Sequence, residues 1–103
     1  MFKKKILKHT LYVGLNDKDK HKQLIKPIKA QDLIKTILNN NGIDGATFIG
    51  SKGVYKAEVE NSFKIEILFA KDKQIKKSIK EIKRRLNQES VAVTREKIVS
   101  NLL

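Results

Sequence analysis

The chain has 103 residues, of which 40% are apolar, and its formal net charge is +12. This length and apolar fraction are typical of one globular domain and argue against an intrinsically disordered chain. The absence of cysteine excludes disulfides, thiolate catalysis and zinc ribbons. No apolar run approaches the roughly 20 residues that a membrane-spanning helix needs. We therefore expect a cytoplasmic protein without a membrane partner.

The positive charge is concentrated in two segments of the chain. Residues 1–29 carry a net charge of +7 and residues 71–85 carry +6. Blocks of one sign create a field that attracts polyanions. A lysine-rich surface that only keeps the protein dissolved is the alternative interpretation of the same pattern.

The first half of the chain predicts a strand and a helix separated by a polar loop. Apolar residues alternate with other residues over 10–15, which indicates a strand with one buried face. Residues 16–22 are polar and predict a loop, and Pro27 favours the start of a helix. The apolar stripe of this helix consists of Ala30, Leu33, Ile34, Ile37 and Leu38. Gly42 is a natural residue for its C-terminal cap.

The second half of the chain predicts two strands, a helix and a short last strand. Residues 45–55 form a strand that we expect to bend or bulge at its glycines. Residues 56–62 then join it, as a hairpin, to a strand over 63–69. Asp72 is a suitable N-cap for the second helix. The apolar stripe of that helix consists of Ile75, Ile79, Ile82 and Leu86. The last strand is expected over 91–93.

This order of elements favours a ferredoxin-like βαββαβ sandwich of the α+β class. One antiparallel sheet then carries both helices on one face. Residues 1–9 are expected to form a basic N-terminal arm, and residues 10–103 a single domain. The other face of the sheet is left uncovered, which favours a homodimer or homotrimer. A winged-helix variant is the alternative fold.

Three segments of the sequence resemble a group of known proteins. They are LYVGLND at 11–17, GSKGVY at 50–55 and LNQESV at 86–91. Together they resemble small bacterial and phage proteins of uncharacterised function, whose ferredoxin-like fold is related to PII-like signalling proteins. The resemblance implies the fold, an oligomer and a mobile-element setting such as a plasmid or a phage. It implies no activity.

The second predicted helix is the main candidate binding surface. With its apolar stripe against the core, its outer face is strongly basic. Like charges four residues apart destabilise a helix by roughly 0.2–0.5 kcal/mol per pair, and a polyanion would relieve this repulsion. Together with the N-terminal arm, the predicted nucleic-acid-binding residues are Lys3, Lys4, Lys5, Lys73, Lys76, Lys77, Lys80, Lys83, Arg84 and Arg85. A solvated helix face and a frayed terminus are the alternatives.

A second candidate site follows from the resemblance to PII-like proteins. It would bind a nucleotide or another small polyanion at clefts between subunits. Its residues would be Lys52, Gln88, Glu89, Ser90 and the loop at Asn16. The favoured interpretation of residues 88–90 is nevertheless capping and turn hydrogen bonding.

The sequence contains no pattern that is typical of catalysis. His9 and His21 are its only histidines, and neither stands in a catalytic or metal-binding motif. We therefore expect no metal, no cofactor and no enzymatic activity. The sequence favours a non-catalytic nucleic-acid-binding accessory protein of a bacterial mobile element, with DNA as the preferred partner. The alternative function is that of the PII-like, nucleotide-binding oligomer.

Overall fold

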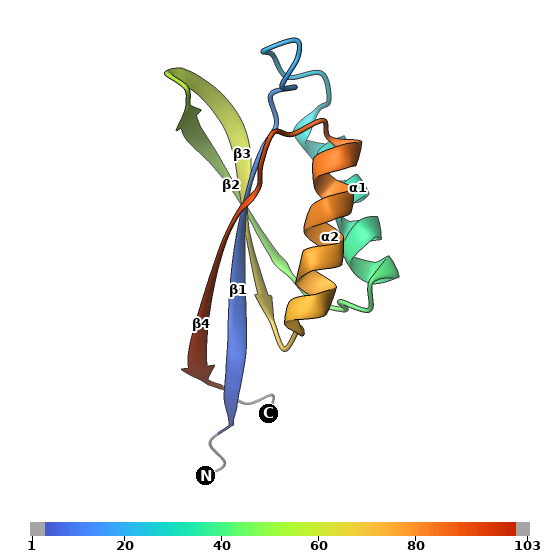
Figure 1. Ribbon diagram of the computed structural model, residues 1–103, viewed down its shortest axis with the longest axis vertical. Helices are drawn as coiled ribbons and strands as arrows, with labels where there is room; N and C mark the ends of the chain where they lie inside the picture. The colour runs from blue at the N-terminus through green and yellow to red at the C-terminus, as the bar shows by residue number, and fades with distance from the viewer. Residues whose placement is uncertain (1–3, 101–103) are drawn as a thin grey trace.

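The computed structural model describes residues 4–100, which form a four-stranded antiparallel sheet and two helices (Figure 1). The elements in chain order are β1 (Lys5–Gly14), α1 (Pro27–Asn40), β2 (Thr47–Tyr55), β3 (Glu58–Leu68), α2 (Asp72–Arg85) and β4 (Ala92–Val99). The strands lie in the order β2-β3-β1-β4, and both helices cover the same face of the sheet. The predicted ferredoxin-like fold is confirmed, and the winged-helix alternative does not apply.

The core lies between the helices and the apolar face of the two central strands. Leu11 lies opposite Ile65, and Val13 lies opposite Phe63 in the antiparallel register. All four side chains are buried. Residues opposite each other in such a pair share one face of the sheet, and successive residues alternate between faces. The alternation in the sequence therefore determines which face of the sheet the helices cover.

Each helix contributes one apolar stripe to this core. The buried residues of α1 are Ala30, Ile34, Ile37 and Leu38, and those of α2 are Ile75, Ser78 and Ile82. The fully buried Ser78 links the two helices. Its Oγ donates to the backbone oxygen of Gln74 (2.9 Å) and accepts a hydrogen bond from Nδ2 of Asn41 (3.1 Å). Neither helix is long and apolar enough to cross a membrane.

The outer ends of the sheet differ from the prediction. β1 begins at Lys5, so residues 5–9 belong to the sheet and do not form a separate arm. β4 continues to Val99, well beyond the predicted residues 91–93. This edge strand is exposed along most of its length, so it lacks the alternation that marks a half-buried strand. The two outer ends meet where the backbone N–H of Ser100 donates to the oxygen of Lys4 (2.9 Å).

β2 and β3 form a long hairpin with a two-residue turn. The turn consists of Lys56 and Ala57, because β3 already begins at Glu58. Both turn residues have a positive φ, 50° and 65°, as a type I′ hairpin turn requires. The pairing runs without a break from Thr47 opposite Glu66 to Tyr55 opposite Glu58. The bulge expected at the glycines therefore does not occur.

The face of the sheet away from the helices combines ion pairs with exposed apolar side chains. Nζ of Lys8 lies 3.0 Å from a carboxylate oxygen of Glu66 and 3.7 Å from one of Glu96. Tyr12 and Ile49 lie on the same face and are exposed by 43% and 41%. No described segment of the chain covers this face (Figure 1).

Candidate functional site

Three segments that are far apart in the sequence meet at one end of the molecule, which we call the hairpin end. They are the loop 15–26 after β1, the tip of the β2–β3 hairpin (residues 52–61) and the loop 86–91 after α2. Figure 1 shows them at the end of the molecule opposite to the start of β1. All three segments of the sequence that resemble known proteins reach this end.

Two amide side chains tie the loop 86–91 to the loop 15–26. Nδ2 of Asn87 donates to the carboxylates of Asp17 (2.9 Å) and Asp19 (2.8 Å). Nε2 of Gln88, a buried side chain, donates to the backbone oxygen of Asn16 (2.7 Å). Asn87 adopts a φ of 48°, a left-handed conformation that asparagine tolerates better than most residues. Asn87 and Gln88 thus hold the loops in place, in agreement with the favoured interpretation of this stretch.

Asp17 organises the first of these loops from within. Its Oδ1 accepts the backbone N–H groups of Asp19 and Lys20, both at 2.9 Å. The hydrogen bond from Asn87, followed by that from the Lys20 backbone, lowers the pKa of this carboxyl below its usual value. Asp17 is therefore ionised over the physiological pH range, which strengthens the bonds that fix the loop.

Gly14 leaves room for a carboxylate at the base of the same loop. A Cβ at this position would collide with the carboxylate of Glu60 on the neighbouring strand. Oε2 of Glu60 accepts the backbone N–H of Asn16 (2.9 Å). The glycine of the LYVGLND segment is thus explained by the approach of Glu60 to the backbone of β1.

Glu89 connects the loop 86–91 to the hairpin tip. The hydroxyl of Tyr55 donates to Oε2 of Glu89 (2.7 Å), and Nζ of Lys56 lies 3.0 Å from the same oxygen. The hydrogen bond from Tyr55, then that from Lys56, lowers the pKa of Glu89. The same contact raises the pKa of Tyr55 and is the main cause of a raised pKa at Lys56. A carboxylate, an aromatic ring and an ammonium group therefore meet at an exposed point of contact between two loops.

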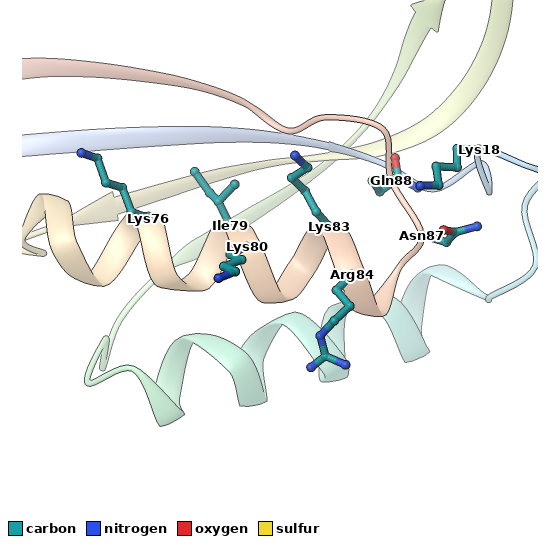
Figure 2. Close-up of a pocket in the computed structure, with 8 residues that line it drawn as sticks. All are labelled: Lys18, Lys76, Ile79, Lys80, Lys83, Arg84, Asn87 and Gln88. Atoms are coloured by element: carbon teal, nitrogen blue, oxygen red, sulfur yellow. The ribbon is translucent and has the colours of Figure 1, made fainter.

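Next to the hairpin end, a basic groove runs along one flank of α2. This hollow of about 470 Å³ is lined by Lys18, Lys76, Ile79, Lys80, Lys83, Arg84, Asn87 and Gln88. Figure 2 shows Lys76, Ile79 and Lys83 along one side of α2, with Lys18 and Gln88 at its C-terminal end. Arg84 points away from this row, toward α1. The groove thus presents four basic residues from one helix and a fifth from the loop 15–26.

The structure separates the residues that the sequence predicts to bind nucleic acid. Lys76, Lys80, Lys83 and Arg84 line the groove. Lys73, Lys77 and Arg85 lie on α2 but are not among the lining residues. Lys4 and Lys5 lie at the start of β1, at the opposite end of the molecule from the hairpin end. Lys3 lies outside the described residues. Sequence reasoning missed Lys18, which reaches the groove from a loop.

The structure also tests the candidate residues of the alternative site. Gln88, Glu89 and the backbone of Asn16 meet at the hairpin end. Lys52 lies on β2 opposite Asn61 and forms no salt bridge among the described residues. Tyr55 and Lys56, and not Lys52, contact Glu89. This contact depends on the register of the hairpin, which the spacing of residues in the sequence does not reveal.

His9 is the one buried histidine of the described residues, and sequence reasoning assigned it no role. Its Nε2 lies 2.7 Å from Oδ1 of Asp72, and the guanidinium of Arg95 lies 2.8 Å from Oδ2 of the same carboxylate. The hydrogen bond with His9, ahead of the charge of Arg95, lowers the pKa of Asp72. This cluster joins β1 and β4 to the start of α2. Within residues 4–100, no group of three or more histidine or acidic side chains is placed to hold a metal ion.

Comparisons with known proteins find no matching family but several similar solved structures. No family model matches the sequence, and no curated protein matches it. Among solved structures, a phage SAM lyase in the apo state is 25% identical with a TM-score of 0.69, over 92% of this chain and 84% of the lyase chain. A complex of phage SAM lyase with S-methyl-5'-thioadenosine is 24% identical, with a TM-score of 0.66, over 93% of this chain and 85% of that one.

Two PII-like proteins share the same fold. The PII-like protein CPII from Thiomonas intermedia, bound to ADP, AMP and bicarbonate, is 11% identical with a TM-score of 0.65 over 99% of both chains. The GlnK–ATP complex from B. subtilis is 20% identical with a TM-score of 0.57, over 91% of this chain and 82% of that one. The chain therefore has the fold of PII-like proteins.

These likenesses correct two expectations from the sequence. The expectation of a nucleic-acid-binding accessory protein is wrong, because the similar structures are PII-like proteins and a lyase, and none points to DNA. The PII-like alternative agrees with them better. The expectation of a non-catalytic protein is also wrong, because the likeness at 25% identity is to a lyase. The physical reason for the first error is that a block of lysines attracts any polyanion and does not select nucleic acid.

Proposed function

We propose that this protein binds a small molecule that contains an adenosine group at its hairpin end, as a PII-like homo-oligomer. One observation carries the proposal: the loop 86–91 is hydrogen-bonded to both other segments of this end. Several solved structures with a similar fold are complexes with ligands of this kind. Those ligands are ADP and AMP, ATP, and S-methyl-5'-thioadenosine. They differ in charge and in the group at the 5' position, and they share adenosine.

The contact between Tyr55, Lys56 and Glu89 offers the groups that an adenosine needs. Tyr55 is 45% exposed, and an exposed aromatic residue can stack on adenine. The carboxylate of Glu89 is ionised because its pKa is lowered by Tyr55 and Lys56, and it can accept hydrogen bonds from ribose hydroxyls or an amino group. The side chains of Lys56 and Glu89 are exposed by 68% and 50%, so a ligand can reach them.

An oligomer would complete this site. Val54 and Val59 at the hairpin tip are exposed by 72% and 66%, and clustered exposed apolar side chains often mark an interface. Ligand sites usually bury most of the ligand surface, which the open hairpin end of one chain does not do. A second copy that packs against the tip or the uncovered face of the sheet would enclose the ligand.

Binding is tested by calorimetric titration of the purified protein with ATP, ADP and S-methyl-5'-thioadenosine, with UTP as the control for the base. We expect at least one adenosine ligand to bind more tightly than UTP. Tyr55→Ala should weaken that binding by roughly tenfold or more through lost stacking. Ser51→Ala, on the same hairpin, is the matched control and should leave binding unchanged. The absence of binding by every adenosine ligand at millimolar concentration would refute the proposal.

Cleavage of S-adenosylmethionine is the second candidate function, and the 25% identity to the phage lyase favours it. The substrate carries a positively charged sulfonium, and the net charge of +12 on this protein repels it. A site for this substrate therefore needs groups that attract a cation. Carboxylates and aromatic faces attract such cations, and Glu89 with Tyr55 provides both. The bond between the sulfonium sulfur and the γ-carbon of the aminobutyrate chain would break with its electron pair left on sulfur, which gives S-methyl-5'-thioadenosine, the molecule found in the lyase complex. The substrate's own carboxylate would form the new bond to the γ-carbon and close a lactone, so the step needs no further reactant.

This second candidate is tested by incubation with S-adenosylmethionine and chromatographic measurement of S-methyl-5'-thioadenosine. We expect product to form faster than in a sample with heat-denatured protein, and Glu89→Gln to slow it. Equal rates with and without folded protein would exclude the lyase activity and leave the binding proposal intact.

A further inference from the structure

The basic groove on α2 gathers five basic residues from two segments of the chain. Its five basic residues form no salt bridge within residues 4–100, whereas Lys8, Lys56 and Arg95 each pair with a carboxylate. Lys76, Lys80 and Arg84 are also spaced four residues apart, an arrangement of like charges that destabilises a helix. A groove that keeps this repulsion needs an explanation beyond solubility.

Stabilisation of the helix itself explains only part of this charge. Basic residues in the last turn interact favourably with the helix dipole, which accounts for Lys83, Arg84 and Arg85. Lys76 and Lys80 lie in the middle of α2 and gain nothing from the dipole. Lys18, from another segment, adds its charge to the same hollow.

The shape and lining of the groove indicate the kind of anion it would hold. Ile79 is partly buried against the core and lies between the lysines, so the groove is a hollow with an apolar wall and a basic rim. Lys76 and Lys83 are seven residues apart, which corresponds to roughly 10 Å along the helix axis. A single small anion would meet only part of this row, whereas a short chain of linked phosphates can meet several of its members.

We propose that the α2 groove binds the oligophosphate group of a small molecule. The lysines neutralise its charges, and the groove determines where the phosphates lie. The groove does not include Tyr55, Lys56 or Glu89, so the proposal does not depend on the adenosine contacts. The oligophosphate can be free or can belong to a nucleotide, and the experiment distinguishes these two sources.

The experiment compares two triple variants of the same helix by calorimetric titration at low salt. The groove variant is K76Q/K80Q/K83Q. The matched control is K73Q/K77Q/R85Q, which removes the same charge from α2 residues that do not line the groove. The probes are inorganic tripolyphosphate, ATP and adenosine. Circular dichroism and thermal melting establish that both variants fold.

We expect the unaltered protein to bind tripolyphosphate, and the groove variant to bind it more weakly by roughly tenfold or more, because each charge contributes to the attraction. The control variant should lose less than about threefold, and added salt should weaken binding in every case. A parallel loss for ATP identifies nucleotides as a source, whereas a loss for tripolyphosphate alone identifies the free anion.

Three results would overturn the proposal: no binding of tripolyphosphate, equal losses in both variants, or unchanged binding in the groove variant. Equal losses would mean that net charge alone attracts the anion. Adenosine carries no phosphate, so its binding to the groove variant tests the proposed adenosine site separately. Retained adenosine binding with unchanged tripolyphosphate binding would leave that site standing while the groove proposal fails.

Discussion

Gly14 cannot be replaced by a larger residue without displacing the side chain of Glu60. We expect Gly14→Ala to push the carboxylate of Glu60 aside, since a Cβ would occupy its place, and to break its hydrogen bond to the N–H of Asn16. The loss of such a bond should lower the free energy of unfolding by about 1–2 kcal/mol. Urea denaturation of both proteins measures this change.

A second glycine supplies the control for this substitution. A Cβ at Gly50, on β2, would meet no atom within 4 Å, so Gly50→Ala should leave stability unchanged or slightly raise it, because alanine restricts the unfolded chain. In a Glu60→Ala background, Gly14→Ala should have almost no further effect. An equal cost in that background would show that the constraint at Gly14 has another origin.

At the residue scale, the sequence singled out segments that meet in the fold, but it did not reveal their contacts. LYVGLND and LNQESV both reach the hairpin end, where Asn87, Gln88 and Glu89 form hydrogen bonds that connect the loops. The partner of Glu89 was not predictable, because Tyr55 meets it only through the register and length of the hairpin. The burial of His9 was hidden too, since an isolated histidine in an alternating strand gives no sign of its partner.

At the scale of elements, the apolar stripes of both helices were predicted, and Ser78 is the buried residue of α2 that the stripe did not include. Ile82 belongs to the predicted apolar stripe and is fully buried. We expect Ile82→Ala to lower the free energy of unfolding by about 2–5 kcal/mol, because it leaves a cavity in the core. Lys77→Ala, on the exposed side of the same helix, should stay within about 0.5 kcal/mol of the parent. Urea denaturation of the two variants checks both values, and similar costs would contradict the packing described.

The strands show that the alternation of apolar residues predicts only the half-buried parts of a sheet. β1 and β3 alternate apolar and other residues because one face is buried, and the alternating parts, 10–15 and 63–69, were predicted. Both strands begin five residues earlier than predicted, at Lys5 and Glu58. β4 is formed by pairing with β1 alone, and its exposed side chains give no period. Hydrogen bonding to β1 determines the length of β4. The local sequence of β4 contains no information about this pairing.

At the scale of the whole molecule, acid should destabilise the fold. Hydrogen bonds and ion pairs lower the pKa of Asp17, Glu66, Asp72 and Glu89 in the folded protein. The folded state therefore binds fewer protons than the unfolded state near the ordinary values of 3.8 and 4.5. Their contribution to stability is complete above those values and is lost as the pH falls through the lowered ones.

Urea midpoints measured from pH 7 to pH 3 test this expectation. The midpoint should be nearly constant down to about pH 5 and then fall. Measurements in added salt separate this effect from the general repulsion of a positively charged chain. A midpoint that does not change down to pH 3 would contradict the contribution of these four carboxylates.

The overall architecture was predictable because the order and period of the elements leave few topologies open. The function was not, because net charge is a property of the whole surface and is compatible with many anionic partners. Two structural observations reduce the number of candidate partners. They are the placement of the lysines on one side of α2 and the likeness of the fold to structures with bound adenosine ligands.

The bond between Ser100 and Lys4 brings the two outer ends of the sheet together. A short peptide that replaces the terminal residues could therefore join them into a ring without reshaping the sheet. Cyclisation reduces the number of conformations open to the unfolded chain, so the circular protein should melt at a higher temperature while its distant loops remain unaltered. The same proximity allows the molecule to be tethered to a surface near Lys4 or Ser100 with the hairpin end facing the solution.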